Sequence, residues 1–114
     1  MGYVIGSSDN ENRREGVGDN FALKIIPHRV ISNEMCRQRK FSFLTSMELC
    51  AVAQGSMGPC EGDSGSPLLN SEMNLQFGIL SYSRSTCKPN RIYVFTRIEP
   101  FLEWINRTMT KLLS

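Results

Sequence analysis

The sequence predicts an all-β fold, a small barrel followed by one C-terminal helix. Apolar segments are short and rich in β-branched and aromatic residues, stretches rich in Gly and Pro separate them, and only the C-terminal segment shows helical periodicity. A chain of 114 residues suffices for a single core. We therefore assign residues 1–114 to one domain.

The N-terminal part predicts two strand regions and a short helix. Val4-Ile5 ends a short strand, and polar residues 9–20 predict an exposed, mobile loop. Residues 21–30 are apolar but contain Pro27, which predicts an edge strand or two short strands. The polar residues from Ser32 predict a helix start, because they can cap the first turn.

Four further strands are expected, at residues 49–53, 67–69, 76–82 and 91–97. Residues 54–65, rich in Gly, Ser and Pro, separate the first two as a loop of tight turns. Residues 99–113 predict a helix with one apolar side that packs on the body; that side comprises Phe101, Trp104, Ile105, Met109 and Leu112.

Charge gives no indication of a nucleic-acid or membrane partner. The net charge is +2 with acids and bases interspersed, and no segment is long and apolar enough to span a bilayer. The short basic run at residues 37–40 is interpreted as a solvated loop. A signal peptide is also missing after Met1, so we expect the chain to begin inside a longer protein.

The four cysteines predict disulfides rather than a metal site. None of them forms a C-x-x-C pair, and we expect neither a metal nor a cofactor. Disulfides persist in oxidising compartments, which places the parent protein outside the cell. Three pairings are open for the set Cys36, Cys50, Cys60 and Cys87.

The segment CEGDSGSP at residues 60–67 carries the chemical signal. It places Ser64 between glycines on a tight turn, where main-chain N–H groups can approach a substrate carbonyl. A Gly-Asp-Ser-Gly string by itself is also a common surface turn. Its neighbours make the difference, because they follow in a recognisable order along the chain.

The segment resembles the G-D-S-G-G-P signature of trypsin-like serine peptidases. Residues 81–83 (SYS) resemble the family's S-W-G, residues 30–36 resemble V-x-S-N-x-x-C, and residues 91–105 resemble P-G-V-Y-T-R-V…W-I. The resemblance implies the second, six-stranded antiparallel barrel of a chymotrypsin-like two-barrel fold with its C-terminal helix. The chain would then be the C-terminal half of a peptidase domain whose N-terminal barrel is absent.

The resemblance also assigns roles. Ser64 would be the nucleophile, the N–H groups of Gly62 and Ser64 the oxyanion hole, and Asp63 the partner of an amino terminus freed by activation. Without that terminus we expect the oxyanion loop to be poorly ordered. The implied disulfides are Cys36–Cys50 and Cys60–Cys87.

Two catalytic groups of the family have no counterpart. His28, the chain's one histidine, stands in Pro-His-Arg rather than A-A-H-C and is expected to be structural or solvated. No aspartate stands in a D-I-A-like context either. We therefore predict that the polypeptide alone has no peptidase activity.

The resemblance places Gly58, Ser81, Tyr82, Ser83 and Arg91 at the substrate pocket. Gly58 stands where trypsin-like enzymes keep an aspartate, which argues against a preference for Arg or Lys. Ser83 replaces a glycine at the pocket mouth. Arg91 would favour acidic or small side chains at the cleaved residue, block the pocket, or point outward as a surface residue.

The expected partners are a protein or peptide substrate, the missing N-terminal barrel and protease inhibitors. A second interpretation is a secreted, non-catalytic homologue that binds partners, because Ser66 replaces the second glycine of the signature. A third is an unrelated disulfide-bonded secreted module. Asn106-Arg107-Thr108 matches the N-glycosylation sequon.

Overall fold

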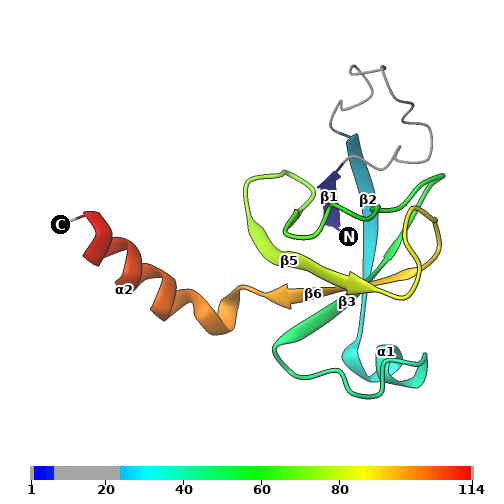
Figure 1. The fold of residues 1–114 in the computed structure, drawn as a ribbon, viewed down its shortest axis with the longest axis horizontal. Helices are drawn as coiled ribbons and strands as arrows, with labels where there is room; N and C mark the ends of the chain where they lie inside the picture. The colour runs from blue at the N-terminus through cyan, green and yellow to red at the C-terminus, as the bar shows by residue number, and fades with distance from the viewer. Residues whose placement is uncertain (1, 7–23, 114) are drawn as a thin grey trace.

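Figure 1 shows the computed structural model, which describes residues 2–6 and 24–113. Its six antiparallel strands close into a barrel in the order β1-β2-β3-β6-β5-β4. This is the predicted fold class. The loop expected at residues 9–20 lies outside the described residues. The strands are β1 (Gly2–Gly6), β2 (Lys24–Ile31), β3 (Glu48–Ala53), β4 (Pro67–Leu69), β5 (Gln76–Ser83) and β6 (Ile92–Arg97), and the helices are α1 (Asn33–Gln38), the 3-10 turn η3 (Glu99–Phe101) and α2 (Leu102–Leu113).

The prediction of an edge strand or two short strands around Pro27 is wrong. β2 is one strand that pairs with β1 on one side and β3 on the other. The carbonyl of Pro27 accepts from Gln54 N–H at 2.9 Å, just past the end of β3. The N–H and C=O groups of one residue point to the same side of a strand, so the missing N–H of Pro27 would also point toward Gln54. β3 has already ended there, and the proline therefore removes no hydrogen bond between β2 and β3.

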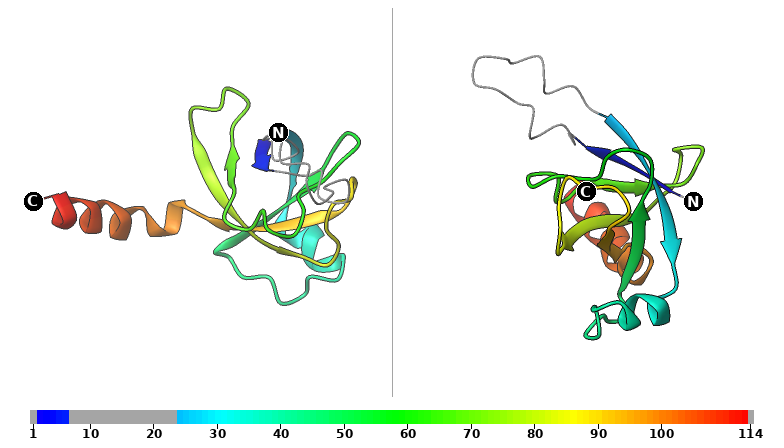
Figure 2. Two further views of the ribbon diagram at one scale, coloured as in Figure 1. Left: turned by 45° about the horizontal axis from the view of Figure 1, so that its top comes forward. Right: turned by 90° about the vertical axis from the view of Figure 1, so that its right-hand side faces the viewer.

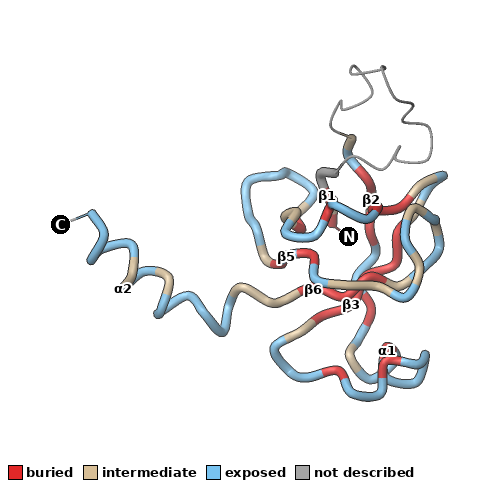
Figure 3. The backbone as a smooth tube through the Cα atoms, in the orientation of Figure 1, coloured by how far each residue is buried: buried red, intermediate tan, exposed pale blue. Residues whose placement is uncertain are grey.

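β3 and β6 are buried on both faces, which explains why they show little alternation of polar and apolar residues. Leu49, Ala51 and Ala53 of β3 face the barrel interior, and Cys50 and Val52 face a second apolar cluster under α1. Successive side chains on a strand point to opposite faces, so the two cores share one strand. Figure 3 shows the buried residues gathered in this region.

Capping and disulfides fix the loops around the barrel. The Ser32 side chain accepts from Met35 N–H at 3.1 Å, which confirms the predicted start of α1. Both implied pairings are confirmed: one joins α1 to β3, and the other joins the segment before Ser64 to the segment before β6. They are Cys36–Cys50 and Cys60–Cys87.

α2 does not pack on the barrel, contrary to expectation. It extends away from the strands (Figures 1 and 2), none of its residues is buried, and Trp104 is 63% exposed. The apolar periodicity predicted the helix correctly, but the expectation that its apolar side packs on the barrel was wrong. In the described part of the chain, no helix has the length and apolar character needed to cross a membrane.

His28 is structural, one of the two expected alternatives. It is fully buried on β2, with Nδ1 3.0 Å from the Ile26 carbonyl oxygen and its ring edge-on to Tyr93 and Phe95 at 5.8 Å. Within the described residues its Nε2 has no hydrogen-bond partner. Burial lowers the pKa of His28 below 6.5, and the bond to Ile26 opposes this only in part.

We expect His28 to make the fold acid-sensitive. Below pH 6.5 the unfolded chain takes up a proton at His28 that the folded chain, with its lowered pKa, does not, so the free energy of unfolding falls as pH decreases. The slope can approach about 1.4 kcal/mol per pH unit for one proton. Denaturation followed by circular dichroism between pH 7.5 and 5.5 measures it.

The control for this prediction is His28→Phe, which keeps a ring but cannot titrate. Tyr93, the titratable group in contact with the ring, stays neutral in this range because burial raises its pKa. The variant should lose the pH slope whatever its absolute stability. An equal slope in both proteins would contradict the assignment.

Candidate functional site

Ser64 lies on a turn that begins at Cys60. The Asp63 N–H donates to the Cys60 carbonyl at 2.9 Å, and the Asp63 Oδ2 atom accepts from the Cys60 N–H at 2.8 Å. Asp63 is buried, whereas Ser64 is exposed. The carboxylate predicted to pair with a new amino terminus is therefore bonded here to its own turn, and that pairing stays a prediction.

Two main-chain bonds tie the other end of the turn to β5. Gly65 N–H donates to the Leu80 carbonyl at 2.8 Å, and Leu80 N–H donates to the Ser66 carbonyl at 2.9 Å. Ser66, the residue in place of the signature glycine, thus contributes its main chain to the sheet. The turn is anchored at both ends, with Ser64 between the anchors.

Glycine is required on both sides of Ser64 for conformational reasons. Gly62 has φ +98° and Gly65 has φ +92°, and a Cβ added to either would meet no atom within 4 Å. The requirement is thus backbone geometry rather than space. Within the described residues, neither the Gly62 nor the Ser64 N–H donates to a protein acceptor. Two donors beside the hydroxyl can therefore serve a developing negative charge.

Ser64 lines a cavity of about 210 Å³ together with Ser81, Tyr82 and Ser83 of β5. The pairing of β4 with β5 ends at Ile79, so residues 81–83 extend beyond it, and no described strand pairs with their second edge. A register shift around Ser81 marks a bulge there, a feature common next to active sites. An unpaired edge beside a cavity can take an extended peptide.

The hydroxyl of Ser83 donates to the Ile92 carbonyl at 2.6 Å, so this side chain is turned toward β6. Tyr82 is partly buried against the Phe41 ring, 6.3 Å away between centroids, and burial raises its pKa. Both residues were predicted to line the substrate pocket. The structure brings them to the Ser64 cavity, while the substrate-binding role stays a prediction.

Gly58 does not line this cavity, although the next two residues, Pro59 and Cys60, do. A Cβ at Gly58 would come to 2.2 Å from the Lys88 carbonyl oxygen and 2.5 Å from the Tyr93 hydroxyl. That hydroxyl donates to the same carbonyl at 2.9 Å. The space that a side chain at position 58 would need is therefore occupied by protein.

Arg91 does not line the Ser64 cavity. It is exposed and lines a neighbouring cavity, which agrees with the expectation of a surface residue and not with a blocked pocket. Asn106, the sequon asparagine, lies exposed on α2. Among the residues that the structure describes, no cluster of three or more His, Cys, Asp or Glu side chains could hold a metal.

Five lining residues were not singled out from the sequence: Pro59, Glu61, Leu80, Thr86 and Tyr93. Tyr93 could have been found from alternation along β6, because Phe95 two positions on also faces the barrel interior. Glu61 is the one charged side chain of the lining. No spacing rule reveals Glu61 or Thr86, because both lie in loops.

Comparisons with known proteins agree with this geometry. The family model described as Trypsin matches residues 2–105. Chymotrypsin of Phaedon cochleariae is 38% identical over 76 residues, 67% of this chain and 26% of that protein, and chymotrypsin-2 of Vespa crabro is 33% identical over 85 residues, 75% of this chain and 37% of that protein.

Two solved structures share the fold. HL collagenase superposes with a TM-score of 0.75 and kallikrein-related peptidase 10 with 0.73, each 25% identical and each covering 96% of this chain. The matched region is 46% and 50% of those two chains, respectively. The chain thus spans about half the length of these solved structures, and less of the two chymotrypsins.

The packing around Gly58 predicts a stability loss on substitution. Gly58→Ala should lower the free energy of unfolding by about 1–3 kcal/mol, because the main chain around Lys88 has to shift. Ser56→Ala, at an exposed position nearby, should change it by less than about 0.5 kcal/mol. Chemical denaturation measures both, and equal stabilities would show that the loops are loosely packed.

Proposed function

Because the chain belongs to the trypsin family of serine peptidases, we propose that it is the half of a serine endopeptidase domain that carries the nucleophile, the oxyanion hole and the primary substrate pocket. One observation carries the proposal. Ser64 is exposed at a cavity, beside two main-chain N–H groups that donate to no protein acceptor in the described part of the chain.

The proposed reaction is acyl transfer. The Ser64 hydroxyl attacks the peptide carbonyl, its proton passes to a base, and the N–H groups of Gly62 and Ser64 stabilise the negative oxygen. The base then protonates the leaving amine, and water releases the acyl group by the same steps. Residues 81–83 would hold the peptide along the unpaired edge of β5.

The base has to come from outside this chain. Its one histidine, His28, is fully buried in the barrel core and does not line the Ser64 cavity. We propose that an N-terminal barrel supplies the histidine and the aspartate that orients it. The exposed apolar side of α2, with Trp104 and Leu112, is a candidate contact surface for that barrel.

We expect the chain alone to show no hydrolysis, and an assembly with a family N-terminal barrel to react with a phosphonate serine probe and to cleave peptides. Ser64→Ala should remove the probe reaction and lower kcat by at least about a thousandfold, because the nucleophile is lost. Labelling followed by mass spectrometry measures the first, and peptide hydrolysis the second.

Ser66→Ala is the matched control, a second serine of the same turn, and should keep both activities. The proposal fails if the isolated chain cleaves peptides in a Ser64-dependent manner. It also fails if the assembled protein binds substrate peptides yet is neither labelled nor active.

The lining of the cavity predicts a preference for uncharged side chains at the cleaved residue. Its one charged lining residue, Glu61, is exposed and screened by water. An acidic preference would need Arg91, which lines the neighbouring cavity. A peptide library offered to the assembled enzyme tests this, and efficient cleavage after Arg or Lys is the contrary result.

A second candidate function is a non-catalytic homologue that binds partners. Ser66 favours it, because this residue departs from the family signature beside the nucleophile. Protease inhibitors are further proposed partners of the assembled enzyme. We also propose that the parent protein is secreted, since its two disulfides are stable in an oxidising compartment.

A further inference from the structure

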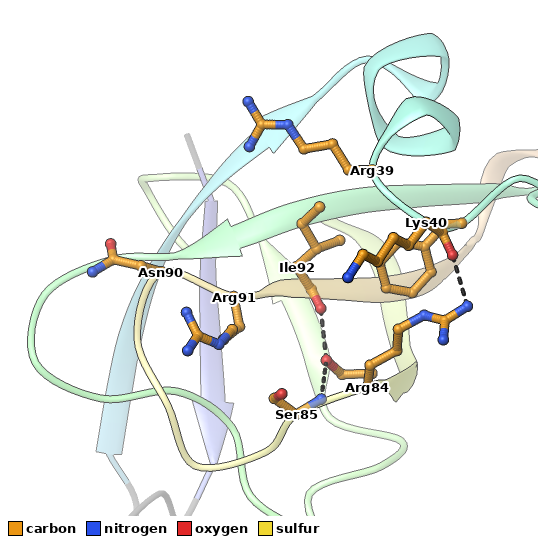
Figure 4. A pocket seen from close by; sticks show the side chains of 9 residues that line it. Arg39, Lys40, Arg84, Ser85, Asn90, Arg91 and Ile92 are labelled. Carbon is orange, nitrogen blue, oxygen red and sulfur yellow. Dashed lines mark hydrogen bonds between the residues drawn. The ribbon is translucent and has the colours of Figure 1, made fainter.

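A second cavity, of about 330 Å³, lies beside the Ser64 cavity and shares Ser83 with it. Four of its lining residues are cationic and none is acidic; they are Arg39, Lys40, Arg84 and Arg91. They come from three segments: the end of α1, the end of β5 and the approach to β6. Figure 4 shows Arg39, Arg84 and Arg91 around this cavity, which we call the basic cavity.

The cations of the basic cavity have no acidic partners among the described residues. The ion pair found among the described residues joins Arg107 to Glu103, and both lie on α2, away from the barrel. Four like charges in one hollow repel one another, and a bound anion relieves that repulsion. The sequence interpretation of residues 37–40 as a merely solvated loop therefore misses how the fold combines Arg39 and Lys40 with distant arginines.

Arg84 is held in place before any ligand arrives. Its Nη2 donates to the Lys40 carbonyl at 2.7 Å, and its guanidinium lies 5.2 Å from the centroid of the buried Phe41 ring. Lys40 takes a left-handed conformation, φ +81°, which a residue with a Cβ adopts at a cost. An oriented guanidinium loses less freedom when it binds a carboxylate.

The position of the basic cavity relates it to the proposed substrate path. Ser83 belongs to both cavities, and its hydroxyl is fixed by the Ile92 carbonyl, with Ser85 N–H donating to it at 3.3 Å. A peptide that lies along residues 81–83 and continues past Ser83 reaches the basic cavity. This step rests on the function proposed above.

We propose that the basic cavity binds an acidic segment of a polypeptide, with carboxylate side chains a few residues away from the residue held at Ser64. A long sulfated polysaccharide fits less well, because it needs an extended track of cations. This chain has a net charge of only +2, and four of its 13 basic residues lie in this one hollow.

Binding is tested on Ser64→Ala, so that catalysis plays no part. Isothermal titration calorimetry is run with an eight-residue peptide of alternating Glu and Gly and with its Gln-Gly counterpart. The acidic peptide should bind at least about tenfold tighter, as expected when hydrogen bonds to charged groups form. Its affinity should fall as salt is raised.

The site is tested with Arg39→Gln/Arg91→Gln, two exposed side chains with no hydrogen bond in the described structure. This double variant should bind the acidic peptide with an affinity at least about tenfold lower. The matched control Arg29→Gln/Arg107→Gln removes the same charge from exposed positions elsewhere and should leave the affinity unchanged. Melting curves check that each protein folds. If the double variant does not fold, the two single variants are measured in its place.

Three results would overturn the proposal. The acidic peptide could fail to bind up to millimolar concentration, or it could bind the basic-cavity variant and the charge-matched control equally. Alternatively, heparin could bind in a manner that depends on Arg39 and Arg91 while the acidic peptide does not bind. None of these readouts depends on reactivity of Ser64, so failure of this proposal is distinguishable from failure of the proposed catalytic function.

Discussion

The two main-chain hydrogen bonds between the serine turn and Leu80 fix the position of Ser64 relative to residues 81–83. They continue the pairing of β4 with β5, so the turn is an extension of the sheet rather than a separate loop. The pairing ends at the same point, and residues 81–83 extend past it with an edge that no described strand pairs with. The barrel strands therefore fix the relative positions of the Ser64 hydroxyl, the main-chain N–H groups beside it and the edge of residues 81–83.

Much of the fold could be predicted from the sequence because its strands are short and separated by clear turn residues. β3, β4, β5 and β6 lie where residue chemistry placed them. Pro27 led to a wrong prediction, because proline normally marks an edge strand. Only the strand register shows that β3 ends before it reaches the nitrogen of Pro27. The packing of α2 was also missed, since an apolar side does not identify its partner surface.

The site was predictable in part for a similar reason. Local sequence identified the turn around Ser64, because the need for glycine at positions 62 and 65 is a property of the backbone alone. It could not place Arg91 or Arg39, because cavity membership depends on which distant segments the fold brings together. Chemistry set by neighbours in sequence is readable, whereas chemistry set by neighbours in space needs the structure.

The position of Trp104 has a practical consequence, because it is the only tryptophan of the chain and lies exposed on α2. Indole emission from this protein reports the surroundings of the terminal helix and says little about the barrel. Melting of the six strands should leave that emission nearly unchanged. A partner that covers the helix should shift it to shorter wavelength, as an apolar environment does, which gives assembly a spectroscopic signal of its own.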